Sequence, residues 1–137
     1  MTSACEVYLG LYGDDFEPDD VSDFIGLMAT SIQLKGEHDS DLAHPKASVW
    51  KFSLGRIESE VVDVYEMSEK LVEQLSAFEF EITGATQKFN LSAKLQVVLW
   101  IDQNDTKSMP SIGFERPVLR FLNAISASID IDTYRGV

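Results

Sequence analysis

The sequence is poor in the residues on which many kinds of catalysis depend. Its 137 residues include one cysteine, two histidines and eight glycines, and the glycines are scattered. No GxSxG, P-loop, GxGxxG, CxxC or HExxH motif is present, so the chain lacks common patterns of hydrolases, nucleotide-binding proteins and metalloproteases. The lone Cys5 cannot form an intramolecular disulfide, which fits a reducing compartment.

Basic residues and long apolar runs are also scarce. Eleven Lys and Arg residues stand against 23 Asp and Glu residues, and the formal net charge is -12. Such a charge repels phosphates and anionic lipids, so we expect neither nucleic acid nor a membrane as a partner. No apolar run approaches the roughly 20 residues that cross a bilayer. The start of the chain shows no signal-peptide pattern, and we expect a cytoplasmic protein.

What remains is an ordinary globular composition. Hydrophobic residues make up 45% of the chain and charged residues 25%. This balance is typical of a folded protein, and 137 residues are enough for a hydrophobic core. We therefore expect a single domain over residues 1–137.

Hydrophobic patterning predicts strands and helices in alternation. Alternating apolar residues predict strands at residues 5–13, 30–36, 48–56, 93–102 and 128–134. Helical spacing of apolar residues predicts helices at residues 17–28, 64–78 and 116–127, with a weaker segment at 79–89. Residues 112–115 are expected to be a short extended piece, and residues 37–47 a loop.

Two of these strands carry aromatic residues on the face opposite their main apolar side. Tyr8 and Tyr12 alternate with aliphatic residues in the first strand, and Val98 and Trp100 do so in the strand at 93–102. If the strands are neighbours, these residues form an aromatic patch on one side of the sheet. We expect the patch either to contact a partner or to be covered by residues 79–90.

The chain also contains a sequence repeat at a constant offset of 97 residues. Phe24 corresponds to Phe121 and Ile32 corresponds to Ile129, each within a strand–helix–strand unit. The units span approximately residues 6–36 and 94–134. The predicted fold is therefore α+β: a two-layer sandwich with a mixed, largely antiparallel sheet, helices mainly on one face, and an internal pseudo-twofold repeat.

Three groups of residues are candidates for chemistry. Asp130 and Asp132 alternate with isoleucines near the C-terminus, so both carboxylates project from one strand face. With Asp14 and Asp15 they could bind a hard cation, but the spacing matches no calcium loop, and a hydrated or paired surface is favoured. Cys5 is a candidate nucleophile, although the start of a strand favours an apolar filling role.

The third group is the segment "EHDSDLAH". It offers imidazoles and carboxylates that could ligate zinc, and these belong to Glu37, His38, Asp39, Asp41 and His44. Their spacing matches no known zinc pattern, which favours a solvated loop. We predict no catalytic residues, no cofactor and no tightly bound transition metal.

Several segments resemble one bacterial family, named domain of unknown function 4279. They are "YLGLYGDDFEPDDV", "IGLMATSIQLKGE", "VWKFSL" and "SIDIDTY", and the resemblance extends over nearly the whole chain. Its most specific part is the ending carried by residues 129–134. Ala29 departs from the family, where many members are expected to have proline. The resemblance implies a bacterial source and brings no activity and no catalytic residues.

Three classes of function remain open. The first is a non-catalytic, bacterial protein-binding module, of which an immunity-type inhibitor of a basic toxin is one concrete version. The second is a small enzyme or metal-binding protein, and the third is a structural homo-oligomer. Charge and the aromatic patch favour the first class. Its expected partner surface consists of Tyr8, Tyr12, Trp100, Asp130 and Asp132, and its expected partner is a basic protein.

Overall fold

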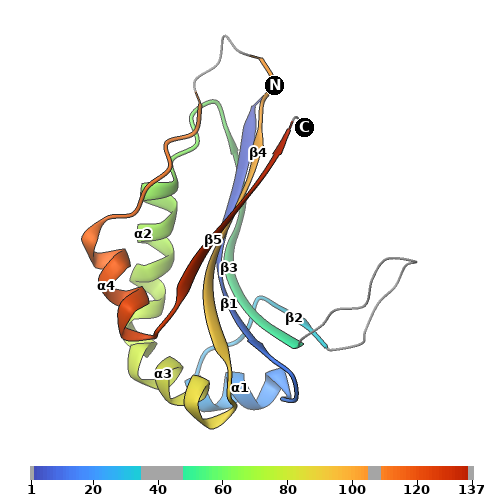
Figure 1. Ribbon diagram of the computed structural model, residues 1–137, viewed down its shortest axis with the longest axis vertical. Helices are drawn as coiled ribbons and strands as arrows, with labels where there is room; N and C mark the ends of the chain where they lie inside the picture. The colour runs from blue at the N-terminus through green and yellow to red at the C-terminus, as the bar shows by residue number, and fades with distance from the viewer. Residues whose placement is uncertain (1, 35–47, 105–108, 136–137) are drawn as a thin grey trace.

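The chain folds around one mixed, five-stranded sheet with four α-helices, in a computed structural model that describes residues 2–34, 48–104 and 109–135 (Figure 1). The strands are β1 (Ser3–Gly13), β2 (Ser31–Gln33), β3 (Ser48–Ser59), β4 (Ser92–Ile101) and β5 (Ser128–Arg135). The helices are α1 (Pro18–Ile25), α2 (Val64–Leu75), α3 (Glu79–Lys88) and α4 (Arg116–Ala124), with a 3₁₀ turn η1 (Ser76–Phe78) between α2 and α3. The predicted α+β class with a mixed sheet is confirmed.

The strand order is β2-β3-β1-β4-β5, which places β1 at the centre. β1 pairs antiparallel with both β3 and β4, and β2 pairs antiparallel with β3. β4 and β5 are parallel, so the chain must cross over between them, and α4 lies on this crossover. The two outer strands of the sheet are therefore the short β2 and the longer β5.

Local sequence signals set the ends of the helices. α1 begins at Pro18, because a proline in the first turn loses no intrahelical hydrogen bond. It ends at Gly26, whose φ of 83° is the left-handed conformation that glycine adopts without strain. α2 begins after Asp63, whose carboxylate accepts a hydrogen bond from the backbone N–H of Glu66 at 3.4 Å.

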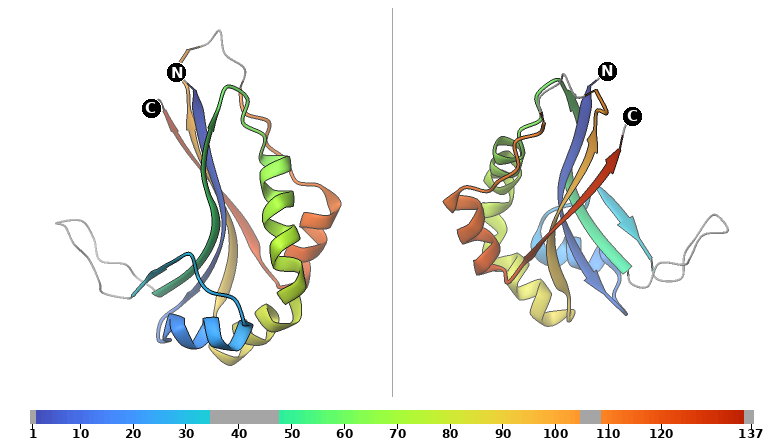
Figure 2. Two further views of the ribbon diagram at one scale, coloured as in Figure 1. Left: turned by 180° about the vertical axis from the view of Figure 1, so that it is seen from behind. Right: turned by 45° about the horizontal axis from the view of Figure 1, so that its top comes forward.

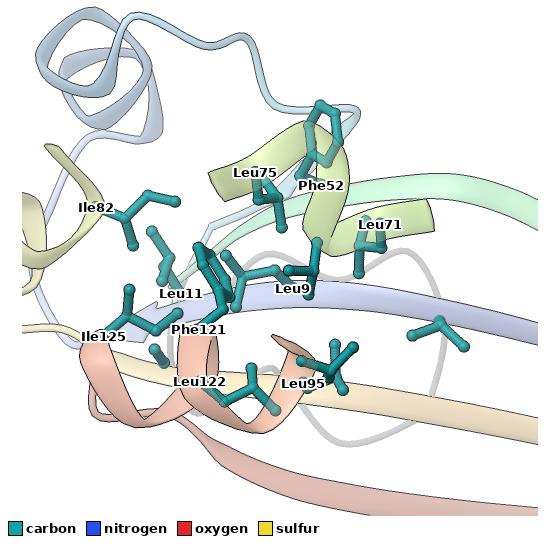
Figure 3. Close-up of a cluster of buried hydrophobic side chains, with 14 of the residues drawn as sticks. Leu9, Leu11, Phe52, Leu71, Leu75, Ile82, Leu95, Phe121, Leu122 and Ile125 are labelled. Atoms are coloured by element: carbon teal, nitrogen blue, oxygen red, sulfur yellow. The ribbon is translucent and has the colours of Figure 1, made fainter. Parts of the chain in front are cut away.

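All four helices lie on the same face of the sheet. Each buries side chains in one core cluster with the aliphatic residues of β1 and β4, and Figure 3 shows part of this cluster. The helices contribute Val21 and Ile25 from α1, Leu71 and Leu75 from α2, Ile82 and Ala85 from α3, and Phe121 and Leu122 from α4. The strands curve, with the helices on the convex side (Figures 1 and 2). The concave side of the sheet is named the open face below.

The two units of the sequence repeat take different positions in this sheet. β3 lies between β1 and β2, whereas β4 and β5 are direct neighbours. Phe121 is 2% exposed, but Phe24 is 39% exposed and packs edge-on against Phe89. The structural equivalence of the units, with its pseudo-twofold symmetry, therefore stays a prediction.

The structure adds detail to several of the finer sequence predictions. Ile129 and Ile131 face the helix side of β5, as expected, but they are 36% and 40% exposed, in an outer strand of the sheet. Residues 112–115 form no strand, and only Ser111 makes an isolated bridge, to Asp63. The loop expected at 37–47 lies outside the described residues. Among the described helices, none is long and apolar enough to cross a membrane.

Replacement of Phe121 by alanine should strongly destabilise the protein. The ring is almost fully buried in the core, and such truncations cost roughly 3–5 kcal/mol of the free energy of unfolding. Urea denaturation followed by circular dichroism measures this change. Phe24→Ala is the matched control, and it should cost clearly less because that ring is partly exposed. Equal losses for the two variants would show that the burial difference does not control stability.

Candidate functional site

The open face carries a band of aromatic, amide and charged side chains. Its residues are Glu6, Tyr8 and Tyr12 from β1, Lys51, Ser53 and Arg56 from β3, Lys94, Gln96, Val98 and Trp100 from β4, and Asp130, Asp132 and Tyr134 from β5. The register aligns them in rows across the strands. Tyr8 pairs with Gln96, which pairs with Asp130, and Trp100 pairs with Tyr134. The five residues expected to form a partner surface therefore lie on one face.

Residues 79–90 do not cover the aromatic patch. Of the two explanations that the sequence left open, coverage by this segment is therefore excluded. α3 occupies most of this segment, and Ile82 and Ala85 are fully buried in the core on the opposite side of the sheet. Since the other three helices bury their side chains in the same core, no described helix lies on the open face (Figure 2). Within residues 2–34, 48–104 and 109–135, no helix covers the patch.

Tyr8 and Tyr12 form a hydrogen-bonded pair at the centre of the band. The side-chain hydroxyls of Tyr8 and Tyr12 are hydrogen-bond partners. This arrangement depends on Gly10, because a Cβ there would lie 2.6 Å from Cε1 of the Tyr12 ring. Burial raises the pKa of Tyr8 above the usual tyrosine range, and the neighbouring Tyr12 and Glu6 add to the shift. Burial also raises the pKa of Tyr12.

Gln96 connects this pair to the acidic residues of β5. Its side chain is only 5% exposed although it lies on the open face. Its amide nitrogen donates to Oδ2 of Asp132 at 3.1 Å and to the backbone oxygen of Asp130 at 3.3 Å. The carboxylate of Asp132 is thus held in place by a neutral amide, while Asp132 itself is exposed. Hydrated or paired carboxylates were expected here, and an amide partner was not.

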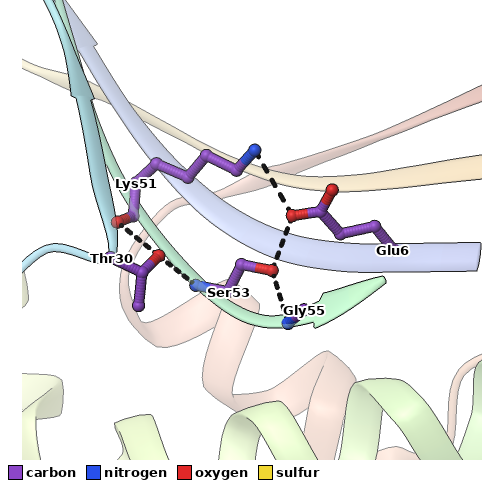
Figure 4. Close-up of polar contacts among 5 residues, drawn as sticks. All are labelled: Glu6, Thr30, Lys51, Ser53 and Gly55. Atoms are coloured by element: carbon purple, nitrogen blue, oxygen red, sulfur yellow. Dashed lines mark hydrogen bonds and ion pairs between the residues drawn. The ribbon is translucent and has the colours of Figure 1, made fainter. Parts of the chain in front are cut away.

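A second polar network lies where β1 meets β3 (Figure 4). Oε2 of Glu6 accepts a hydrogen bond from the Ser53 hydroxyl at 2.7 Å and lies 3.3 Å from the Lys51 ammonium. Ser53 Oγ in turn accepts from the backbone N–H of Gly55 at 2.9 Å. Glu6 is therefore neutralised locally.

Cations lie against the aromatic rings of the band. The Lys51 ammonium is 4.0 Å from the centre of the Tyr8 ring, and the Arg56 guanidinium is 4.2 Å from that of Trp100. Trp100 also stacks on Tyr134, with ring centres 6.2 Å apart. The open face is therefore not uniformly negative. Lys51 and Arg56 lie on β3, and Lys94 of β4 lies 5.4 Å from the centre of the Tyr12 ring. The acidic side chains of Asp130 and Asp132 lie on β5.

Sequence reasoning missed Glu6, Lys51 and Gln96. Each lies on the open face, on the same side of the sheet as the aromatic residues. Each is two positions from another open-face residue of its own strand: Glu6 from Tyr8, Lys51 from Ser53, and Gln96 from Val98. The two-residue period of a strand could have placed them on the open face. Their contacts required the pairing of β1 with β3 and of β4 with β5, which the sequence did not show.

The other candidates for chemistry are not part of this band. Cys5 is fully buried in the core, and burial, followed by the charge of Glu6, raises the pKa of its thiol to about 11. The thiol is therefore protonated at neutral pH and is a poor nucleophile. The segment with Glu37, His38 and His44 lies outside the described residues. Within the part of the chain that the structure describes, no three His, Cys, Asp or Glu side chains are grouped to hold a metal.

Aromatic rings, one amide and the carboxylates of Asp130 and Asp132 thus project from the open face of the sheet. The model of one family, described as domain of unknown function (DUF4279), matches residues 3–136. No curated protein and no solved structure matches the chain.

The Cys5 thiol should react with a thiol reagent only when the protein unfolds. It is fully buried and its pKa is about 11, so both access and thiolate formation are suppressed at neutral pH. Titration with Ellman's reagent, with and without denaturant, measures this. Rapid stoichiometric reaction of the native protein would contradict the buried position.

The free energy of unfolding should fall as the pH rises above about 10, the ordinary tyrosine pKa. Folding raises the pKa of Tyr8, so the unfolded chain loses this proton first and gains stability as the pH increases. Below the ordinary pKa both states are protonated, and Tyr8 contributes no pH dependence. Urea denaturation across this range measures the slope. The slope should be smaller in Tyr8→Phe, and an unchanged slope would refute the assignment to Tyr8.

Proposed function

The chain belongs to the family described as domain of unknown function (DUF4279), and from the geometry of its open face we propose that it is a non-catalytic protein-binding module for a basic partner. An immunity-type inhibitor of a basic toxin is one concrete version. A bacterial source and a cytoplasmic location are parts of the same proposal. The buried, protonated Cys5 fits a reducing compartment.

The observation that carries the proposal is the uncovered row of aromatic residues. Tyr8, Trp100 and Tyr134 project from three strands onto a face that no described helix covers. Large aromatic rings supply much of the binding energy at protein interfaces, because they bury wide apolar surfaces and lose little conformational entropy. The Trp100–Tyr134 stack and the Tyr8–Tyr12 hydrogen bond fix these rings before a partner arrives.

Charge supports a basic partner over an acidic one. The chain has a formal net charge of -12, and Asp130 and Asp132 place two carboxylates at the β5 side of the open face. The positive side chains of the band are already engaged: Lys51 with Glu6, Arg56 with the Trp100 ring, and Lys94 with the Tyr12 ring. A negative surface increases the rate of encounter with a cationic protein and loses that advantage as salt screens it.

The alternatives are less well supported by the same geometry. A small enzyme would need a group poised to exchange protons near neutral pH, but burial raises the pKa of both Tyr8 and Tyr12 further from that range. A structural homo-oligomer would bring together chains that each carry a net charge of -12. The binding module is therefore the function that we propose.

Removing the two negative charges of Asp130 and Asp132 should weaken capture of the partner. The wild-type protein and an Asp130→Asn, Asp132→Asn variant are immobilised and exposed to lysate of the source organism at low and high salt. The captured protein is identified, purified and measured by isothermal titration calorimetry. We expect a basic protein whose affinity falls in the variant and at high salt.

A matched control separates the open face from net charge. Glu69→Gln with Glu73→Gln removes the same two charges from α2, which lies on the opposite side of the sheet. This control should bind like the wild type, and Tyr134→Ala should bind more weakly. Equal weakening in the two charge variants, together with unchanged binding of Tyr134→Ala, would refute a specific role for the open face.

A further inference from the structure

The outer edge of β5 is a continuous row of backbone groups that no described strand pairs. On its inner side β5 pairs with β4 from Ser128 to Arg135 without any shift in register. On its outer side the described ranges, 2–34, 48–104 and 109–135, contribute no neighbour. A straight, unpaired edge of this length is a template for another strand.

The opposite edge of the sheet is blocked by local structure. β2 pairs with only three residues of β3. Beyond these residues, the pairing of β3 with β1 has an irregular register, and this part of β3 includes Gly55, whose φ is 102°. The Thr30 hydroxyl accepts from the backbone N–H of Ser53 at 2.9 Å and donates to the backbone oxygen of Lys51 at 3.1 Å (Figure 4). A side chain thus satisfies the backbone groups that a further strand would need. In the described ranges, β5 has neither a short covering strand nor a register irregularity.

The side chains of β5 select which strand could be added. Asp130 and Asp132 project on the open face, while Ile129 and Ile131 are partly exposed on the helix side. The side chains of an added strand would lie next to those of β5 on the same face of the sheet. A strand with Lys or Arg on one face and β-branched apolar residues on the other would pair with both rows.

A second copy of the chain is a poor occupant of this edge. Two copies of β5 could pair antiparallel about a twofold axis, with their open faces on the same side. If Ile131 lies opposite Ile131 of the other copy, then Asp130 lies opposite Asp132 of the other copy. The adjacent allowed registers place Asp130 opposite Asp130, or Asp132 opposite Asp132. Like charges directly opposite each other destabilise the pairing, and two chains of charge -12 repel each other in addition.

We propose that β5 docks an extended segment of a basic partner, which adds a strand to the sheet and alternates cationic with β-branched apolar residues. The proposal rests on the protein-binding function above and assigns its mode of recognition. Backbone hydrogen bonds along β5 supply affinity, and Asp130 and Asp132 select cationic side chains beside the aromatic band.

The test uses a backbone-cyclised β-hairpin peptide whose outer strand reads Lys-Val-Lys-Val-Lys. Cyclisation fixes the strand in advance and so reduces the entropy lost on binding. We expect a dissociation constant below about 1 mM at low salt by calorimetry. In nuclear magnetic resonance spectra the amides of residues 128–135 should shift, and those facing the outer edge should become protected from exchange with solvent.

Two controls separate strand addition from general charge attraction. A peptide N-methylated at the outward amides keeps its charges but cannot pair, and it should bind at least about tenfold more weakly. Asp130→Asn with Asp132→Asn should weaken the original peptide roughly 2- to 30-fold, since each cross-strand charge pair makes a small contribution. Glu69→Gln with Glu73→Gln should leave its affinity within about twofold of wild type.

Absence of peptide binding, or equal binding of the methylated peptide, would overturn the proposal. Its failure is distinguishable from failure of the protein-binding function. If the peptide fails while a captured partner still depends on Tyr134, Asp130 and Asp132, the open face binds partners without strand addition. If the captured partner is also insensitive to these residues, both proposals fall.

Discussion

The strict alternation of β1 is the constraint on which the rest of the structure depends. Its residues Cys5, Val7, Leu9 and Leu11 are buried on one side, and Glu6, Tyr8 and Tyr12 lie on the other. Because β1 is the central strand, this division fixes which face of the sheet the four helices cover. A shift of β1 by one residue would exchange the two sets and expose the core. The core and the open face are therefore two consequences of one pattern.

The open face gains its order from small residues and satisfied polar groups. Gly10 leaves space for the Tyr12 ring, which lies back toward Tyr8 instead of extending into solvent. The Gln96 amide donates to the carboxylate of Asp132, and the carboxylate of Glu6 accepts from Ser53. Polar groups that are largely removed from water must be hydrogen-bonded, so these contacts restrict the positions that the side chains can adopt. Such restriction lowers the entropy lost when a partner binds.

The two edges of the sheet differ for reasons that lie in the chain itself. The edge at β3 is closed by a short strand, an irregular register and the Thr30 hydroxyl. The edge at β5 is straight, and two carboxylates provide its protection against self-pairing. The negative charges of Asp130 and Asp132 repel an acidic strand and attract a basic one. In the proposed binding mode, the same two residues would both disfavour self-association and select a basic partner.

The sequence by itself determined the α+β class, the position of most elements and the side of each strand on which Tyr8, Tyr12, Trp100, Asp130 and Asp132 project. These features follow from local periodicity, which a single strand or helix already contains. It also identified Phe121 as a core residue and indicated the family that the match over residues 3–136 confirms.

Only the tertiary structure decided which strands are neighbours and what covers each face. The order β2-β3-β1-β4-β5 separates β1 from β2, and no local pattern in either strand specifies that. The partial exposure of Ile129 and Ile131 follows from the outer position of β5, and the position of α3 away from the aromatic band follows from burial of Ile82 in the core. Strand order and layer packing depend on contacts between residues far apart in sequence, so periodicity within one segment cannot determine them.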